Sequence, residues 1–159
     1  PLAEAYRLEA GTAAPVFGVY DIRGEKVRLD QFLGAWVALV FLPTVSEPGA
    51  YGLAKNLSEK AFLAGQGNLA VVVFTADAAE QAAMAVEGLD LPPRVVSDPW
   101  QVMFGVYGAI DPDSGEPRAG LILVDATGLI HTALYDAEAL DAERVVELIG
   151  GLTPPSSEH

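Results

Sequence analysis

Side chains that commonly carry out catalysis are scarce in this chain of 159 residues. It contains no cysteine, which removes disulfides, thiolate nucleophiles, iron–sulfur clusters and thiolate zinc sites together. Two histidines, His131 and His159, are too few for a histidine-rich metal site, and no Ser/His/Asp set follows from spacing. Residues 49–52 lack the Lys-Ser/Thr that follows in a phosphate-binding loop. The sequence therefore predicts neither a metal nor a cofactor.

Other reactive or ligand-binding side chains are better explained by packing. Met84 and Met103 can be oxidised, but filling gaps in the core is the favoured interpretation. Trp36 and Trp100 are expected to pack against a sheet. His131 shares one face of an expected strand with apolar residues, which predicts a packed or half-exposed ring.

The charge balance restricts the partners. Nine Lys and Arg against 22 Asp and Glu give a formal charge of −13, which repels phosphate backbones and anionic lipid. We therefore expect no nucleic-acid or membrane partner. No apolar run reaches the roughly 18 residues of a membrane span, so a cytoplasmic location is expected. Export stays an alternative, because a chain that begins at Pro1 can have been trimmed.

The pattern of apolar and turn residues predicts one α/β domain. Its bounds are residues 1–151, with an N-terminal arm at 1–14 and a flexible tail at 152–159. A β-hairpin (16–20 and 25–28) and a helical turn (29–33) are expected first. Buried strands (35–42, 68–76 and 94–96) then alternate with helices (48–65, 77–87 and one capped by Asp98 with Pro99 in its first turn). A closing hairpin (119–125 and 129–135) and helix (141–149) complete a sandwich around a mixed central sheet.

Several segments, in this order and spacing, resemble one known family. They are residues 11–17 and 21–29, 36–43, Ser97-Asp98-Pro99 with Tyr107-Gly108, and 117–125 with Gly128. Together they resemble the peroxiredoxins, the alkyl hydroperoxide reductase/thiol-specific antioxidant family of the thioredoxin fold. The resemblance runs from Gly11 to Ile149 and implies a thioredoxin-like sandwich with a family-level role in antioxidant or redox response.

The family's active-site loop has the pattern Pro-x-x-x-Thr-x-x-Cys. On this sequence Pro43 occupies the Pro position, Glu47 the Thr position and Ala50 that of the peroxidatic cysteine. The preceding Pro48-Gly49 resembles the bacterioferritin-comigratory branch. The segment that resembles the family's arginine-bearing strand supplies Arg118. The resemblance therefore implies a degenerate site without a catalytic residue.

Peroxide reduction of this type requires a thiolate that attacks one peroxide oxygen while the other leaves as hydroxide. Alanine has no lone pair to donate, so we expect no thiol peroxidase activity. A partly buried guanidinium without an anion is destabilised by desolvation. We therefore expect Glu47 and Arg118 to form an ion pair that fills the former active site.

Three functional interpretations remain open. The favoured one is a non-enzymatic interaction or scaffold protein. Dimers of the family that the chain resembles often form close to the active-site loop, so the resemblance implies Tyr51, Trp100 and Phe104 as a contact surface for a homodimer or a protein partner. A cysteine-free variant made by engineering is disfavoured, because removing cysteines alone would leave Thr at position 47.

The remaining alternative is a repurposed pocket. In it, Thr44, Glu47, Tyr51 and Arg118 bind a carboxylate or another small ligand, or take part in enzymatic chemistry that needs no thiol. A thermal shift caused by a ligand would favour this pocket, and capture of a partner would favour the interaction protein.

Overall fold

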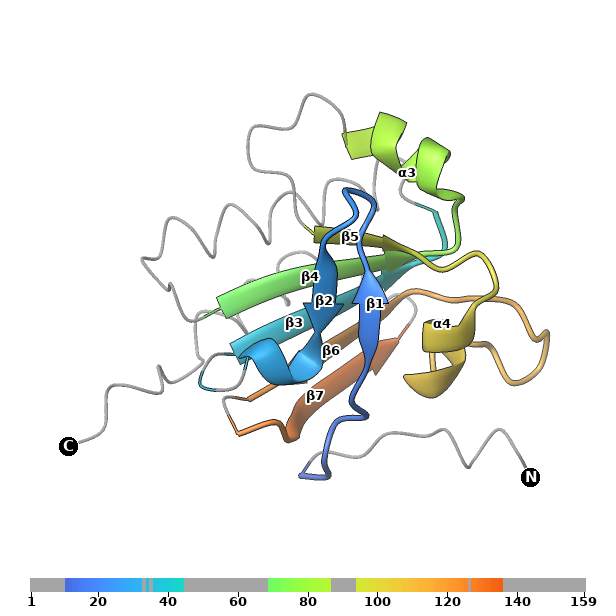
Figure 1. Ribbon diagram of the computed structural model, residues 1–159. Helices are drawn as coiled ribbons and strands as arrows, with labels where there is room; N and C mark the ends of the chain where they lie inside the picture. Colours follow the sequence, from blue (N-terminus) through green and yellow to red (C-terminus); the bar gives the residue numbers. More distant parts are fainter. Residues whose placement is uncertain are drawn as a thin grey trace.

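The computed structural model describes residues 11–32, 34, 36–44, 69–86, 94–125 and 127–135. A five-stranded sheet lies at its centre, in the order β5-β4-β3-β6-β7 (Figure 1). Its strands are β3 (Trp36–Leu42), β4 (Leu69–Thr75), β5 (Arg94–Ser97), β6 (Gly120–Val124) and β7 (Ile130–Tyr135). Strands β3, β4 and β5 are parallel, and β6 is antiparallel to both β3 and β7. The predicted mixed sheet and closing hairpin are confirmed. The helices expected at 48–65 and 141–149 lie outside the described residues.

Strand β3 is central because it is apolar on both faces. Leu39 and Phe41 belong to the core cluster on one face, while Ala38 and Val40 point to the other, and all four are fully buried. The ring of Phe41 stacks on Phe74 of β4 with centroids 4.8 Å apart. This packing ties the two central parallel strands together.

The N-terminal hairpin covers one face of the sheet (Figure 1). It consists of β1 (Gly18–Tyr20), β2 (Lys26–Arg28) and the 3₁₀ turn η1 (Leu29–Phe32). Asp21 Oδ1 accepts the N–H groups of Arg23 and Glu25, each at 2.9 Å, which closes the connecting turn. The N–H of Ile22 donates to the carbonyl of Val95 at 2.8 Å and anchors the turn to β5. Buried Val27 joins the core, so the expected hairpin is confirmed.

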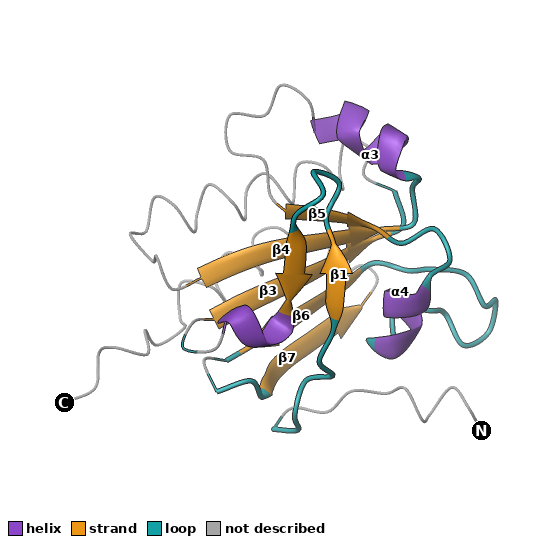
Figure 2. Ribbon diagram, viewed as in Figure 1, coloured by secondary structure: helices purple, strands orange, loops and turns teal. Residues whose placement is uncertain are grey.

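Two α-helices follow the parallel strands, α3 (Ala79–Val86) and α4 (Val102–Val106) (Figure 2). The sequence places Pro99 in the first turn of the second helix, but α4 begins three residues after it. Gln101 adopts the left-handed conformation, with φ 60° and ψ 34°, directly before the helix. Asp98 still caps α4 from this greater distance, because its carboxylate accepts the N–H groups of Val102, Met103 and Phe104. The helix is delayed because the chain turns at residues 99–101 first.

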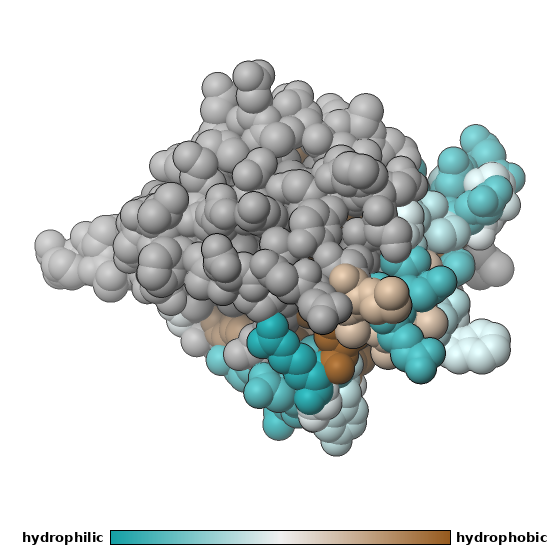
Figure 3. All heavy atoms as spheres, turned by 90° about the horizontal axis from the view of Figure 1, so that it is seen from above, coloured by the Kyte–Doolittle hydropathy of each residue, from teal (hydrophilic) through white to brown (hydrophobic). Residues whose placement is uncertain are grey.

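The described part of the N-terminal arm is bound to the domain. Gly11 N donates to Ile130 O at 2.7 Å, and Ile130 N donates to Thr12 O at 2.8 Å. On the face shown in Figure 3, hydrophilic residues predominate among those described, with a smaller hydrophobic area beside them. None of the helices in the described ranges is long and apolar enough to cross a membrane.

Candidate functional site

The carboxyl ends of the parallel strands β3, β4 and β5 meet at one edge of the sheet. Pro43 follows β3 directly, and Phe41 pairs with Gly120 in the antiparallel register of β3 and β6. Arg118 lies two residues before this pair, where its N–H donates to Ala109 O at 2.8 Å. Two of the residues that the family resemblance singled out therefore lie next to adjoining ends of β3 and β6, although they are far apart in the sequence.

Arg118 is held in one orientation at this edge. Its Nε and Nη2 both donate to the carbonyl of Gly108, at 3.3 and 3.0 Å. Its Cζ lies 4.4 Å from the ring centroid of Tyr135, a cation–π contact. The side chain is half-buried, so its charge is neither freely hydrated nor fully removed from water. A guanidinium fixed in this way is preorganised to meet an anion.

Tyr135 supports this arrangement. Its hydroxyl donates to the carbonyl of Tyr107 at 2.7 Å, which fixes the ring beneath the guanidinium. Burial raises the pKa of Tyr135, and the positive charge of Arg118 partly opposes that rise. The phenol therefore stays protonated and neutral at physiological pH. It acts as a platform for Arg118 rather than as an anion.

A second polar group lies beside Pro43. Thr44 Oγ1 donates to Asp77 Oδ2 at 2.9 Å, and Ser97 Oγ donates to the Asp77 carbonyl at 2.7 Å. The hydroxyl hydrogen of Thr44 is therefore used by a carboxylate, which leaves this residue poorly suited to donate to an anionic ligand. Sequence reasoning placed Asp77 at the start of the helix expected at 77–87 and missed this contact, and α3 begins only at Ala79. Leu42 pairs with Thr75 in the parallel register of β3 and β4, and Thr44 and Asp77 each follow this pair by two residues. The register of the two strands therefore explains why Thr44 and Asp77 meet.

The remaining residues of the expected site lie outside the described residues. They are Glu47, Ala50 and Tyr51. The predicted ion pair between Glu47 and Arg118 therefore stays a prediction. In the part of the chain that the structure describes, no group of three or more Asp, Glu or His side chains could hold a metal ion.

The expected contact surface is partly corrected. The side chain of Trp100 is 88% exposed, so it does not pack against the sheet as the sequence suggested. Phe104 is fully buried and its ring lies 5.3 Å from that of Phe41, so it belongs to the core and not to a contact surface. The carboxylate of Asp98 accepts the Phe104 N–H at 3.2 Å and fixes the position of the start of α4. Val102, 61% exposed, lies beside Trp100 instead and was missed.

Four other residues were expected to pack within the protein. Met103 is buried in the core as predicted, whereas Met84 lies on the outer face of α3 and is 74% exposed, so its expected core role is wrong. Trp36 is half-buried, and its ring meets that of His131 edge-on with centroids 5.2 Å apart. His131 is more exposed than expected, because it lies on β7, at the edge of the sheet.

The chain matches the model of the AhpC/TSA family over residues 10–133. Two curated proteins from Mycobacterium tuberculosis strains CDC 1551 / Oshkosh and H37Rv carry provisional peroxiredoxin names. Each is 28% identical to this chain over 144 residues, covering 87% of it and 92% of the relative.

Solved structures share the fold. A peroxidoxin, BcpB, from Mycobacterium tuberculosis aligns with a TM-score of 0.78 and 18% identity, over 92% of this chain and 99% of that chain. A thiol peroxidase from Chromobacterium violaceum aligns with a TM-score of 0.67 and 24% identity, over 89% and 86%. Taken with the strand order, these matches place the chain in the AhpC/TSA family, as a thioredoxin-fold peroxiredoxin relative that has no cysteine.

Proposed function

We propose that this protein does not reduce peroxides through a thiol and acts instead by binding another protein. The proposed lack of thiol peroxidase activity rests on the absence of cysteine from all 159 residues. Thiol peroxidase chemistry forms a bond between a thiolate sulfur and a peroxide oxygen, and no other side chain here supplies that nucleophile. Arg118 is retained, but a positive charge alone polarises a peroxide without attacking it.

The interaction role is supported by an exposed apolar pair at the start of α4. Trp100 is 88% exposed and Val102 is 61% exposed. Tryptophan is enriched among the residues that contribute most to protein interfaces, because it buries a large area with few rotatable bonds. The N–H of Asp98 donates to Thr75 O at the end of β4, so this pair lies beside the edge that carries Pro43. We name Trp100 and Val102 the α4 patch, and propose a second copy or another protein as its partner.

The first test measures peroxide consumption by purified, metal-free protein, with dithiothreitol or a thioredoxin system as reductant. The native protein is expected to be inert. The Glu47→Thr/Ala50→Cys double variant restores the family pattern and is expected to turn over, with Ala50→Cys alone giving less activity. The Arg118→Lys change in the double-variant background is the matched control, since it keeps the charge but loses the fork of donors. Turnover by the native protein would overturn the proposal.

Anion binding at Arg118 is the second candidate function. It is favoured by the fixed orientation of the guanidinium between the Gly108 carbonyl and the Tyr135 ring. The carboxylate of Asp77, hydrogen-bonded to Thr44 at the same edge, works against an anion there. A thermal shift with acetate or benzoate that disappears in Arg118→Gln would favour this function. Equal shifts in the native and variant proteins would exclude it.

A further inference from the structure

A small pocket lies at the edge of the sheet opposite to Pro43 and Arg118. It has a volume of about 180 Å³ and is formed by the N-terminal segment, η1, the start of β3 and the end of β6. Its lining is mainly apolar and includes Ala14, Val16, Leu29, Phe32, Val37 and Val124. An engineered apolar cavity of about 150 Å³ accepts benzene, so this pocket has room for one small ring or a short branched chain.

The N-terminal segment forms one wall of the pocket, and backbone hydrogen bonds hold this segment in place. Ala14 N donates to Gly128 O at 3.0 Å, and Ala13 forms a β-bridge with Leu129. These bonds continue the contact that Gly11 and Thr12 make with Ile130. The pocket is therefore formed before any ligand arrives, which reduces the free energy that binding must spend on ordering.

Asp125 is one of the residues that line the pocket. Its Oδ1 accepts the N–H and the hydroxyl of Thr127, at 2.9 and 2.7 Å, and the N–H of Leu129 at 3.0 Å. Burial opposes the charge of Asp125, but these hydrogen bonds outweigh burial and lower its pKa. The group is therefore an anion at neutral pH. The three donors reach the same oxygen, Oδ1, and fix the orientation of the carboxylate.

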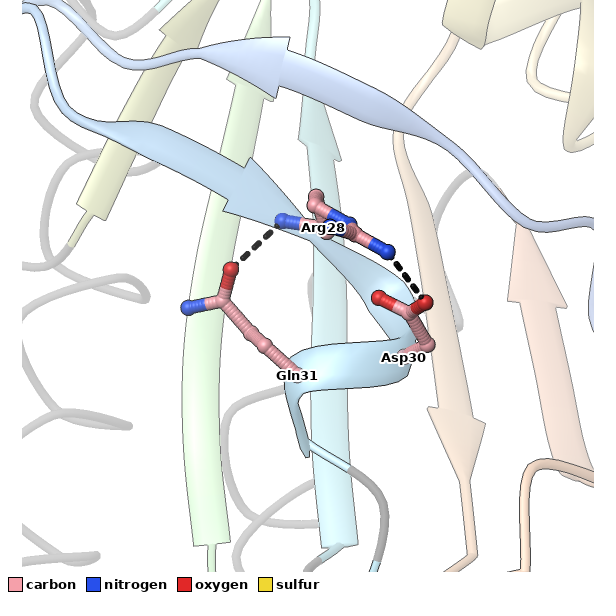
Figure 4. A network of polar contacts seen from close by, with 3 residues as sticks. All are labelled: Arg28, Asp30 and Gln31. Carbon is pink, nitrogen blue, oxygen red and sulfur yellow. Dashed lines mark hydrogen bonds and ion pairs between the residues drawn. The ribbon is translucent and has the colours of Figure 1, made fainter.

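Asp30 is a second acidic residue that lines the pocket. Its Oδ2 pairs with Arg28 Nη2 at 2.7 Å, and Gln31 Oε1 accepts the Arg28 N–H at 2.8 Å (Figure 4). This network fixes the position of Asp30 at the first turn of η1. The ion pair is largely exposed, so it only partly cancels the negative charge of the lining.

We propose that this pocket binds a small organic cation, with its apolar body against the aliphatic lining and its ammonium group at Asp125 and Asp30. The apolar lining favours a ring or branched chain, and the two carboxylates favour a positive over a neutral or negative head group. The formal charge of −13 on the whole chain also attracts such a ligand. This site lies at the other end of β3 from the peroxiredoxin-like edge and does not depend on its chemistry.

The test uses benzylamine as the probe, with benzyl alcohol and benzoate as neutral and anionic probes of the same shape. Backbone amide shifts in NMR titrations give both the location and the dissociation constant. We expect benzylamine to shift the amides around the pocket, benzyl alcohol to bind roughly three- to tenfold more weakly, and benzoate to leave them unchanged.

Two variants and a matched control locate the interaction. Asp125→Asn keeps an oxygen for the Thr127 and Leu129 donors and removes the charge, so it should remove the preference for the amine. Asp113→Asn removes the same charge from an exposed turn away from the pocket and should change binding by less than about twofold. Ala13→Leu, at an exposed lining position, should block the pocket while leaving the rest of the amide spectrum intact.

Three outcomes would overturn the proposal. Benzyl alcohol binding as tightly as benzylamine would exclude recognition of the charge. Shifts confined to other parts of the molecule would exclude the pocket. An equal loss of binding in Asp113→Asn and Asp125→Asn would show only a general attraction of cations to an acidic protein.

Discussion

The guanidinium of Arg118 lies over the ring of Tyr135, with Cζ 4.4 Å from the ring centroid, and the Tyr135 hydroxyl donates to Tyr107 O at 2.7 Å. Arg118 lies just before β6 and Tyr135 is the last residue of β7, so their contact joins the candidate site to the outermost strand of the sheet. Two substitutions of Tyr135 separate the contributions of the hydrogen bond and of the ring contact to the free energy of unfolding.

Tyr135→Phe keeps the ring and removes only the hydroxyl. We expect the free energy of unfolding to fall by about 1 kcal/mol, because one half-buried hydrogen bond is lost. Tyr135→Leu should lower it by roughly a further 0.5–1 kcal/mol, since the cation–π contact is lost as well. Urea denaturation measures both values. Tyr20→Phe, at a position 63% exposed, is the control and should stay within about 0.5 kcal/mol of the native protein. No difference between the three variants would contradict the assigned contact.

Alkaline pH should destabilise the protein through its buried tyrosines. Burial raises the pKa of Tyr107, whose hydroxyl donates to the Pro15 carbonyl, and also raises that of Tyr135. The folded state therefore keeps these protons at a pH where the unfolded chain releases them. The stability from the two phenols is fully present below their unfolded pKa of about 10 and decreases as pH rises above it.

An ultraviolet absorbance titration of the tyrosines checks this dependence. Tyr107 and Tyr135 should ionise only as the protein unfolds. In Tyr107→Phe, stability should fall less steeply between neutral and alkaline pH. The variant lacks one of the groups whose pKa is higher in the folded than in the unfolded state. A steeper loss in Tyr107→Phe than in the native protein would mean that the direction of the pKa shift is wrong.

Gln101 is the one non-glycine residue with positive φ in the described ranges, at φ 60°. A β-branched residue tolerates this conformation poorly, so Gln101→Val should lower the free energy of unfolding by about 1–2 kcal/mol. Glycine adopts it without strain but gains freedom in the unfolded chain, so Gln101→Gly should change stability by less than about 1 kcal/mol. Thermal unfolding compares the two. Equal melting temperatures would argue against the left-handed turn that delays α4.

The α4 patch should matter for association and not for folding. Trp100→Ala and Val102→Ala remove exposed side chains, so each should change the free energy of unfolding by less than about 0.5 kcal/mol. If the patch is an interface, the double variant should shift sedimentation towards the monomer or abolish capture of a partner. Phe104→Ala, four positions after Trp100, should instead lower the free energy of unfolding by roughly 3–5 kcal/mol, because it opens a cavity in the core. Unchanged association in the double variant would exclude the patch.

The central strands were predictable because their signal is local. Residues 36–42 and 69–75 are apolar at nearly every position, and a run of that length requires burial on both faces of a parallel sheet. The hairpins were also predictable from a local signal, because a short turn separates their two strands, as the turn that contains Gly24 does. Boundaries were less certain where a turn intervenes, as at residues 99–101.

What the sequence by itself determined is the limit on chemistry: without cysteine, no arrangement in space supplies a thiolate. The tertiary structure alone decided which polar groups meet. Thr44 and Asp77 are 33 residues apart, and only the parallel pairing of β3 with β4 brings them within hydrogen-bond distance. It also decided that Phe104 is buried while Trp100 is exposed, because the Asp98 carboxylate orients a helix of five residues, which is too short to have a clear apolar period of its own.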